Sequence, residues 1–310
     1  MSFGTAEIKE LRESTGAGMM DCKKALSETN GNMEEAVDWL RTKGLASAAK
    51  KSGRIAAEGL VAVSSADDNK AAAIVEVNSE TDFVARNEQF QNVAEAIAKY
   101  AVKTAGVLED LQEYKCDTFG KPVKDVITDT IATIGENINL RRASGLSVSN
   151  GAVASYVHAP VKPGLGKIGV LVALESTGDQ DKLLQFGKQV AMHIAATNPE
   201  AMTREGVQAD SIERERSVFR EQALASGKPE NIVEKMVEGR ISKFYKEVVL
   251  LEQEYVIEGK ISVQEAVDNF AKELGADVKV VDFVRFGLGE GIEKKEEDFA
   301  EEVKKAAGAA

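Results

Sequence analysis

The sequence predicts an α+β protein in which small antiparallel sheets are covered by helices. Strand-like apolar runs separated by turn residues are followed by a long amphipathic stretch, and this strand–turn–strand–helix order occurs twice, about 95 residues apart. Helical patterns without strands flank and interrupt the two units. At 310 residues the chain is long enough for several cores, so we expect a duplicated scaffold with helical additions.

Composition excludes several classes of function. The net charge of -12 and the pI near 5.0 disfavour a general nucleic-acid binder, which needs a basic face. The two cysteines, Cys22 and Cys116, cannot build a disulfide framework or a four-cysteine zinc site, and they fit a reducing compartment. The first residues lack a signal-peptide pattern, and no apolar run reaches the length of a membrane helix. We therefore expect a cytoplasmic protein without a membrane or direct nucleic-acid partner.

Residues 1–56 are expected to form a three-helix module and a linker. Asn32 with Glu35 resembles a capping box at the start of the third helix, and Gly44 is predicted to end that helix. The turn between the first two helices leads into Met19 and Met20, which lie off the apolar stripe of the second helix. These methionines either fill a small core or form an exposed apolar tip for a partner.

Residues 57–150 are expected to form the first α+β unit. Its strands are predicted at 59–64, 71–77 and 138–148, and its helices at 88–104, 108–114 and 123–134.

The connection NSETDFVARN, residues 78–87, joins the second strand to the long helix of this unit. Thr81 is placed to cap a short helical turn through its hydroxyl, with Asp82 beside the positive end of that turn. Phe83 is an aromatic residue in a polar connection. Its ring either folds onto the local core or projects outward for a partner to bury.

Residues 151–203 and 259–287 are expected to form the second unit. Strands are predicted at 152–159, 168–174 and 277–286, with helices through 183–194 and from Ser262, which forms a capping box with Glu265.

Residues 204–258, inserted in this unit, read as an antiparallel helical hairpin. Apolar residues spaced by four and three form a seam from Val237 to Leu251, which is either satisfied within the hairpin or paired with a second copy of the chain. Residues 288–310 are predicted to carry a last acidic helix with Phe299 and Val303.

Motifs for catalysis or cofactor binding are lacking. Gly164, Gly166 and Gly169 match GxGxxG but lead into a strand, which reverses the order needed for dinucleotide binding. His193 is predicted to be packed in a helix, whereas His158 ends a strand before a proline loop and is free for a contact. Without a nucleophile and base, we expect a binding protein with no cofactor or metal rather than an enzyme.

Two stretches, RESTGAGMMDCKKAL and EVNSETDFVARN, resemble the translation elongation factor Ts family, the guanine-nucleotide exchange factors of elongation factor Tu. Further similar segments are IGENINLRR, YVHA, GVLVAL, KMVEGR and GEGIEK, which extend the resemblance over nearly the whole chain. The family architecture implied is a module like a ubiquitin-associated domain, two related α+β subdomains, a helical hairpin used in dimerisation and a C-terminal helix.

The resemblance also implies a set of partner-binding residues. Those that would disturb the magnesium and phosphate site of elongation factor Tu are Thr81, Asp82, Phe83, Val84, Ile134 and Gly135. Those that would anchor the N-terminal module on the nucleotide-binding domain are Arg12, Met19, Met20 and Lys23. His158 would face a more distant domain, although the loop 160–166 looks longer than in short family members. Ser79 stands where some relatives have Cys.

Two other classes of function stay open. An adaptor like a ubiquitin-associated domain would bind through residues 1–56 alone and would have no exchange activity. A metabolic enzyme of the α+β class would bind a small molecule without a protein partner.

Overall fold

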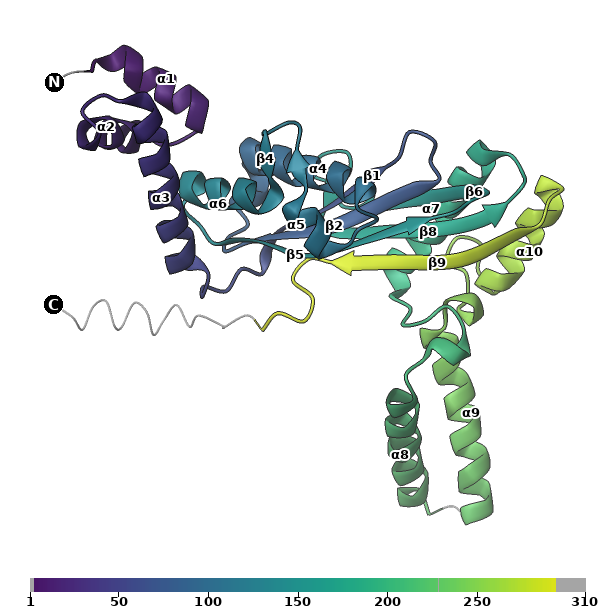
Figure 1. The fold of residues 1–310 in the computed structure, drawn as a ribbon. Coiled ribbons are helices and arrows are strands. Elements are labelled where there is room, and N and C mark those ends of the chain that lie inside the picture. Colours follow the sequence, from purple (N-terminus) through teal and green to yellow (C-terminus); the bar gives the residue numbers. More distant parts are fainter. Residues whose placement is uncertain (1–2, 228, 294–310) are drawn as a thin grey trace.

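The N-terminal helices form a group at one end of the molecule (Figure 1). The structure is a computed structural model, and it describes residues 3–227 and 229–293. The first three helices are α1 (Thr5–Thr15), α2 (Met19–Glu28) and α3 (Met33–Lys51), and they share a small core around Leu11 and Leu26.

The third helix is longer than the sequence analysis predicted. Gly44 does not end it, because the helix continues to Lys51 and packs against a helix of the first unit. A Cβ on Gly44 would lie 3.4 Å from the Cβ of Ala132 in that unit. Gly44 therefore lies inside α3, where it faces a helix of the first unit, and does not end α3.

The first unit contains a sheet of four strands in the order β5-β2-β1-β7. Its strands are β1 (Glu58–Ser65), β2 (Ala71–Ser79), β5 (Ile138–Ser147) and β7 (Leu165–Gly166). The connecting elements are η1 (Val84–Arg86), α4 (Glu88–Lys103), α5 (Leu108–Glu113), β3 (Lys115–Cys116), β4 (Lys121–Pro122) and α6 (Val123–Ile134). Three of the four strands lie where they were predicted, whereas β7 comes from the proline loop of the second unit and adds an edge strand to the first sheet.

The second unit contains a sheet of three strands in the order β6-β8-β9. Its strands are β6 (Gly151–His158), β8 (Ile168–Ser176) and β9 (Val278–Gly287), and its helices are α7 (Gln180–Thr197) and α10 (Val263–Leu274). Ser262 and Glu265 form the predicted capping box at the start of α10. The α+β fold class is thus confirmed.

The two units repeat each other down to backbone irregularities. Gly59 is the second residue of β1 and Gly151 the first residue of β6, and they have φ of 118° and 122°. Their partner strands carry register shifts at the corresponding places, between Glu76 and Val77 in β2 and between Ala173 and Leu174 in β8. Matching bulges at matching positions support a duplicated origin of the scaffold.

The two sheets pack face to face, and the helices cover their outer faces. Alternation along β8 places Leu171 and Ala173 in the cluster between the sheets, and places Val170, Val172 and Leu174 in the cluster under α7 and α10. In the same way α4 covers the outer face of the first sheet. This layered arrangement gives both units a buried, rigid sheet from which loops project.

The helical hairpin consists of α8 (Ala209–Ala225) and α9 (Glu230–Val248) and projects from the body (Figure 1). Short 3-10 turns, η2 (Arg204–Gly206) and η3 (Leu250–Glu252), lie at its base. Val237 and Ile241 of the predicted seam are buried against Ala223 and Val233 within the hairpin. The other seam residues are half-buried, Phe244 and Val248 against the base of the hairpin and Leu251 against the core of the second unit, so the seam packs within the chain. Of the predicted C-terminal helix, residues 288–293 form turns and irregular backbone, and residues 294–310, with Phe299 and Val303, lie outside the described residues.

Candidate partner-binding site

Phe83 projects into solvent from the connection between β2 and α4. Its side chain is 75% exposed, the highest value among the large apolar side chains of the described residues. The sequence analysis left two orientations open, and the structure has the outward one. We call residues 79–87 the Phe83 turn.

A carboxylate from another loop holds this turn from one side. Glu136 accepts a hydrogen bond from the backbone N–H of Thr81 at 2.9 Å and a second from the Thr81 hydroxyl at 2.6 Å. The predicted cap is thus wrong, because the Thr81 hydroxyl is used across the structure and not within its own turn. Charge-assisted bonds of this kind are stronger than neutral ones.

A second carboxylate, this time from the Phe83 turn itself, accepts a hydrogen bond from the loop after α6. Glu80 accepts the backbone N–H of Asn137 at 2.6 Å and pairs with the guanidinium of Arg54 at 3.3 Å. The side-chain amide of Asn137 donates to the carbonyl of Arg54 at 2.7 Å. Two adjacent residues of the Phe83 turn are thus tied to two adjacent residues of the loop after α6. Such reciprocal bonds fix both position and direction.

The residues after Phe83 anchor the turn in the core. Val84 and Ala85 are buried in the cluster under α4, and the side chain of Gln91 donates to the carbonyl of Ala85 at 2.9 Å. Asn87 caps α4 by accepting the N–H of Phe90 at 3.1 Å. Phe83 therefore lies between two fixed segments and has little freedom to fold inward. The ion pair of Asp82 with Arg86 is exposed, so it contributes little to stability.

The predicted partner residues Ile134 and Gly135 lie in the loop that holds the Phe83 turn. Gly135 ends α6 with φ of 89°, and its N–H donates to the carbonyl of Ile131 at 2.9 Å. Ile134 is half-buried, whereas Gly135 is exposed. The hydrogen bonds to Glu136 bring this loop beside the turn, so the two sequence segments form one surface.

The predicted N-terminal residues surround the turn between α1 and α2. Met19 is 44% exposed and Met20 is 73% exposed, so they form an apolar tip and do not fill the core. Arg12 in the last turn of α1 and Lys23 in α2 are both exposed. This tip belongs to a different part of the molecule from the Phe83 turn, and no described contact joins the two.

The two histidines have different surroundings. His158 is exposed at the end of β6, and its Nδ1 lies 3.1 Å from the hydroxyl of Tyr156. His193 is fully buried, with Nε2 2.9 Å from the side-chain oxygen of Gln253 and with Nδ1 accepting the N–H of Val256 at 3.3 Å. Burial lowers the pKa of His193, and the bond to Gln253 opposes this shift only partly. The prediction of a packed histidine is confirmed.

The chemistry available to the described residues is limited. Burial raises the pKa of the Cys116 thiol to about 11 and also raises that of Cys22, so neither is a ready thiolate nucleophile. Within residues 3–227 and 229–293, no group of three or more His, Cys, Asp or Glu side chains could hold a metal ion. In the same ranges no helix is long and apolar enough to cross a membrane.

Sequence reasoning missed the residues that hold the Phe83 turn. Glu80 pairs with Asn137, and Glu136 pairs with Thr81, and more than 50 positions separate the members of each pair. No sequence pattern indicates contacts of this kind. The one available signal was the acidic residue directly after Gly135, because a carboxylate there is badly placed for the negative end of α6 and needs another partner. The tertiary fold supplies that partner in Thr81.

The site thus consists of an exposed aromatic side chain on a braced turn of an α+β scaffold. The family model described as Elongation factor TS matches residues 80–290, which include the Phe83 turn and its partner loop. The chain belongs to the elongation factor Ts family and is therefore a translation elongation factor.

Relatives similar to this chain cover nearly its full length. An elongation factor Ts of Rhodospirillum centenum is 58% identical over 306 residues, which are 99% of each chain. That of Parvibaculum lavamentivorans is 59% identical over 300 residues, 97% of each chain. That of Rhizobium etli strain CIAT 652 is 59% identical over 298 residues, 96% of each chain.

Proposed function

We propose that this chain is a cytoplasmic guanine-nucleotide exchange factor that binds elongation factor Tu carrying GDP and speeds the release of that GDP. The observation that supports this best is the outward Phe83, in a turn held by hydrogen bonds at Thr81 before it and at Ala85 after it. Family membership supports the choice of partner. In this proposal Asp82 and Phe83 enter the nucleotide-binding domain and disturb its magnesium and phosphate site, with Ile134 and Gly135 beside them.

Phe83 cannot produce the whole effect. Speeding release by ~10⁴ requires about 5.5 kcal/mol of selective stabilisation of the opened partner. Burying one Phe side chain contributes roughly 1.5 to 3 kcal/mol. The remainder has to come from other contacts, and the exposed surfaces around Met20 and His158 are the ones we assign to it.

We assign the tip formed by Arg12, Met19, Met20 and Lys23 to the same nucleotide-binding domain, and His158 to a more distant domain of the partner. The tip combines apolar area with a basic rim, which suits a surface that has both an apolar hollow and acidic groups. In this division of labour the remote contacts supply affinity, and the Phe83 turn converts part of it into nucleotide release.

The proposed units of the chain are residues 1–56, 57–150, 151–203 with 259–287, 204–258 and 288–310. The hairpin unit, 204–258, is the proposed site of a homodimer. Its outer surface keeps exposed apolar side chains, among them Val218, Leu224, Ile232 and Met236. Sedimentation of the full chain against a hairpin variant carrying polar residues at these positions tests the dimer.

The deciding experiment measures release of labelled GDP from purified elongation factor Tu with and without this chain. The proposal predicts a large acceleration that saturates with added chain. Because coupling between two ligands is reciprocal, excess unlabelled GDP must also weaken the complex of the two proteins. Equal affinity of the chain for its partner with and without GDP would contradict exchange and would favour a simple adaptor.

A further inference from the structure

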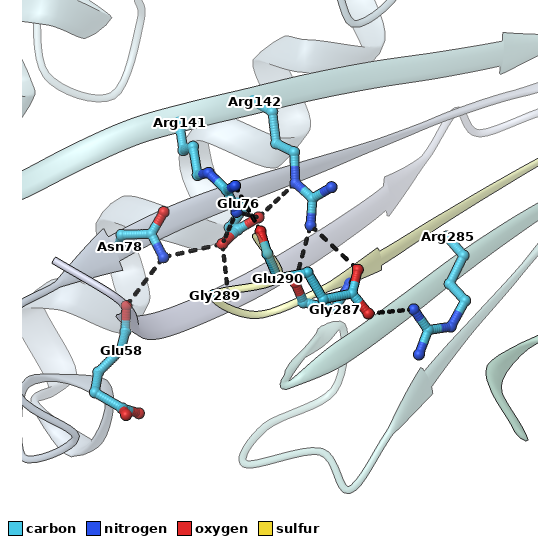
Figure 2. A network of polar contacts seen from close by, with 9 residues as sticks. All are labelled: Glu58, Glu76, Asn78, Arg141, Arg142, Arg285, Gly287, Gly289 and Glu290. Atoms are coloured by element: carbon cyan, nitrogen blue, oxygen red, sulfur yellow. Dashed lines mark hydrogen bonds and ion pairs between the residues drawn. The ribbon is translucent and has the colours of Figure 1, made fainter. Parts of the chain in front are cut away.

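Glu76 is a fully buried carboxylate in the strand that leads to the Phe83 turn (Figure 2). Its oxygens accept from Nη1 of Arg141 at 3.1 Å, Nε of Arg142 at 2.5 Å, the side-chain amide of Asn78 at 3.0 Å and the N–H of Gly289 at 2.8 Å. Burial by itself would raise the pKa of this carboxyl, but the hydrogen bonds outweigh that effect and lower it. Glu76 is therefore ionised and paired.

A bulge between β2 and β5 makes the double pairing with arginine feasible. Glu76 lies opposite Arg142, and the next residue, Val77, lies opposite Leu140, so Arg141 is the extra residue. Successive residues of a regular strand point to opposite faces, whereas a bulge lets two neighbours turn toward one side. Both guanidiniums thus reach the same carboxylate.

The duplicated unit shows that the bulge does not need these charges. At the matching place in the second sheet Ala173 lies opposite Asp282, Leu174 lies opposite Val280, and Val281 is the extra residue. Ala173 is buried in the cluster between the sheets, on the same face that Glu76 occupies in the first sheet. One fold thus forms the same bulge twice, once around a carboxylate and once around a methyl group.

The same charges bind the segment that follows β9. Arg142 donates from Nη2 to the carbonyl of Gly287 at 2.8 Å, and Arg141 donates from Nη2 to the carbonyl of Glu290 at 2.6 Å (Figure 2). Gly289 has φ of 73°, and a Cβ there would lie 2.5 Å from the carbonyl oxygen of Ala57. The end of the second unit is therefore locked onto the base of β1 and β2.

The bulge lies directly below the candidate site. Glu76 is three residues before Ser79, roughly 10 Å along an extended strand, and the Phe83 turn begins there. Arg141 and Arg142 lie in β5, which begins immediately after the loop of Glu136 and Asn137. The two strands joined by the Glu76 ion pairs are thus the two that carry the Phe83 turn and the loop that braces it.

We propose that Glu76 is a positioning residue for Phe83, because its ion pairs with Arg141 and Arg142 fix the offset between the two strands that end in the Phe83 turn and in its bracing loop. The effect of Glu76 on GDP release rests on the proposed exchange function. Its effect on the hydrogen bonds of the turn does not depend on that function. The matching bulge in the second unit has no such charge cluster, and that unit has no Phe83 turn. The cluster is therefore not needed to form the bulge, which leaves positioning of the turn as its role.

The test compares the wild-type chain with a triple variant, Glu76→Ala with Arg141→Val and Arg142→Met. Removal of Glu76 alone would take away the carboxylate that Arg141 pairs with and would leave Arg142 with Glu290, at 3.7 Å. Replacing all three side chains by apolar ones instead makes this bulge resemble the one in the second unit, which forms without such a charge cluster. The control is Asp282→Asn at the bulge of the second unit, where the side chain is exposed. Amide hydrogen exchange of Thr81 and Asn137 is measured in the free protein, and GDP release is measured over a range of concentrations of the chain.

In the triple variant we expect the Thr81 and Asn137 amides to exchange at least about tenfold faster. We expect the maximal rate of GDP release to fall about tenfold, while the half-saturating concentration changes less than about threefold, because the remote contacts remain. The control should match the wild type in both measurements.

A folded triple variant with unchanged amide protection, or with faster amides but an unchanged maximal rate, overturns the positioning role. If the triple variant does not fold, Glu76→Gln decides by the same two measurements, because it keeps the shape and removes the charge. A third outcome is that the triple variant loses amide protection but the wild-type chain itself does not speed GDP release. That result would support the positioning role of Glu76 and would refute the proposed exchange function.

Discussion

Glu136 accepts two hydrogen bonds from Thr81, one from the backbone N–H at 2.9 Å and one from the hydroxyl at 2.6 Å, although the two residues are 55 positions apart in sequence. Next to this pair, Glu80 accepts the N–H of Asn137. The orientation of Phe83 is therefore determined by a loop that contributes no aromatic side chain of its own. Residues that never touch a partner should influence exchange through this brace.

Replacing Glu136 by Ala should weaken exchange without unfolding the chain. Hydrogen bonds to charged groups contribute about 1.5 to 3 kcal/mol each when well formed, and this pair is partly exposed, so we expect a loss near the lower end, about 1 to 2 kcal/mol, in local stability. GDP release should slow by about 5- to 30-fold, which corresponds to that energy. Stopped-flow release of labelled GDP measures it. Glu109→Ala, at an exposed acid in α5, is the matched control, and equal rates in the two variants would contradict the brace.

Replacing Phe83 by Ala should slow GDP release by about 10- to 150-fold, the equivalent of the roughly 1.5 to 3 kcal/mol that burial of the ring supplies. The midpoint of urea unfolding should stay the same, because the side chain is 75% exposed in the free protein. Val256→Ala removes another exposed apolar side chain, 51% exposed, in the segment 204–258 that contains the hairpin. A Phe83 variant that exchanges GDP as fast as the Val256 variant would remove Phe83 from the site.

The order of elements could be predicted from sequence because each strand and helix has its own period. Strands β1, β2, β6, β8 and β9 and helices α4, α7 and α10 lie close to the predicted ranges. The face-to-face packing of the two sheets and the edge strand β7 were not predicted. Both depend on contacts between segments far apart in sequence, and a run such as Leu165–Gly166 is too short to show a period.

Part of the candidate site could likewise be predicted from sequence, and part of it could not. The exposed Phe83 could be anticipated as one of two orientations, because an aromatic residue in a polar connection is unusual. The hydroxyl of Thr81 was assigned to a local cap because local partners are the ones that sequence shows. Its actual partner, Glu136, and the pairing of Glu76 with Arg141 and Arg142 depend on strand register, and a bulge changes register by one residue without a clear sequence signal.

Replacing Gly59 or Gly151 by Ala should destabilise the chain strongly and about equally. A Cβ on Gly59 would lie 2.2 Å from the carbonyl oxygen of Val77, and one on Gly151 would lie 2.0 Å from that of Leu174. Both glycines also have positive φ, so each variant should lose more than about 2 kcal/mol of unfolding free energy. Gly239→Ala in α9 is the control. It meets nothing within 4 Å, and we expect it to be neutral or stabilising by up to about 1 kcal/mol.

The buried His193 should make the folded chain less stable as the pH falls. Its Nδ1 accepts the N–H of Val256, so its Nε2 carries the proton shared with the side-chain oxygen of Gln253. Because burial lowers the pKa of His193 in the folded chain, the unfolded chain binds a proton first as the pH falls below the unfolded pKa of about 6.5. This residue therefore costs no stability at higher pH, and it lowers the unfolding free energy by up to about 1.4 kcal/mol per pH unit between the unfolded and the folded pKa.

Urea unfolding between about pH 5 and pH 7.5 should reveal this contribution as a difference between variants. The stability of the wild type at each pH sums the effects of all its charged groups, so its slope alone does not isolate one group. In His193→Gln the loss of stability on acidification should be smaller than in the wild type, even though the variant starts from a lower stability. His158→Gln, which replaces the exposed histidine and leaves the hydrogen bonds of His193 in place, is the matched control substitution. If His193→Gln and the wild type lose stability in parallel over the whole range, His193 is protonated as readily in the folded chain as in the unfolded one, and its hydrogen bonds to Gln253 and Val256 do not hold it neutral.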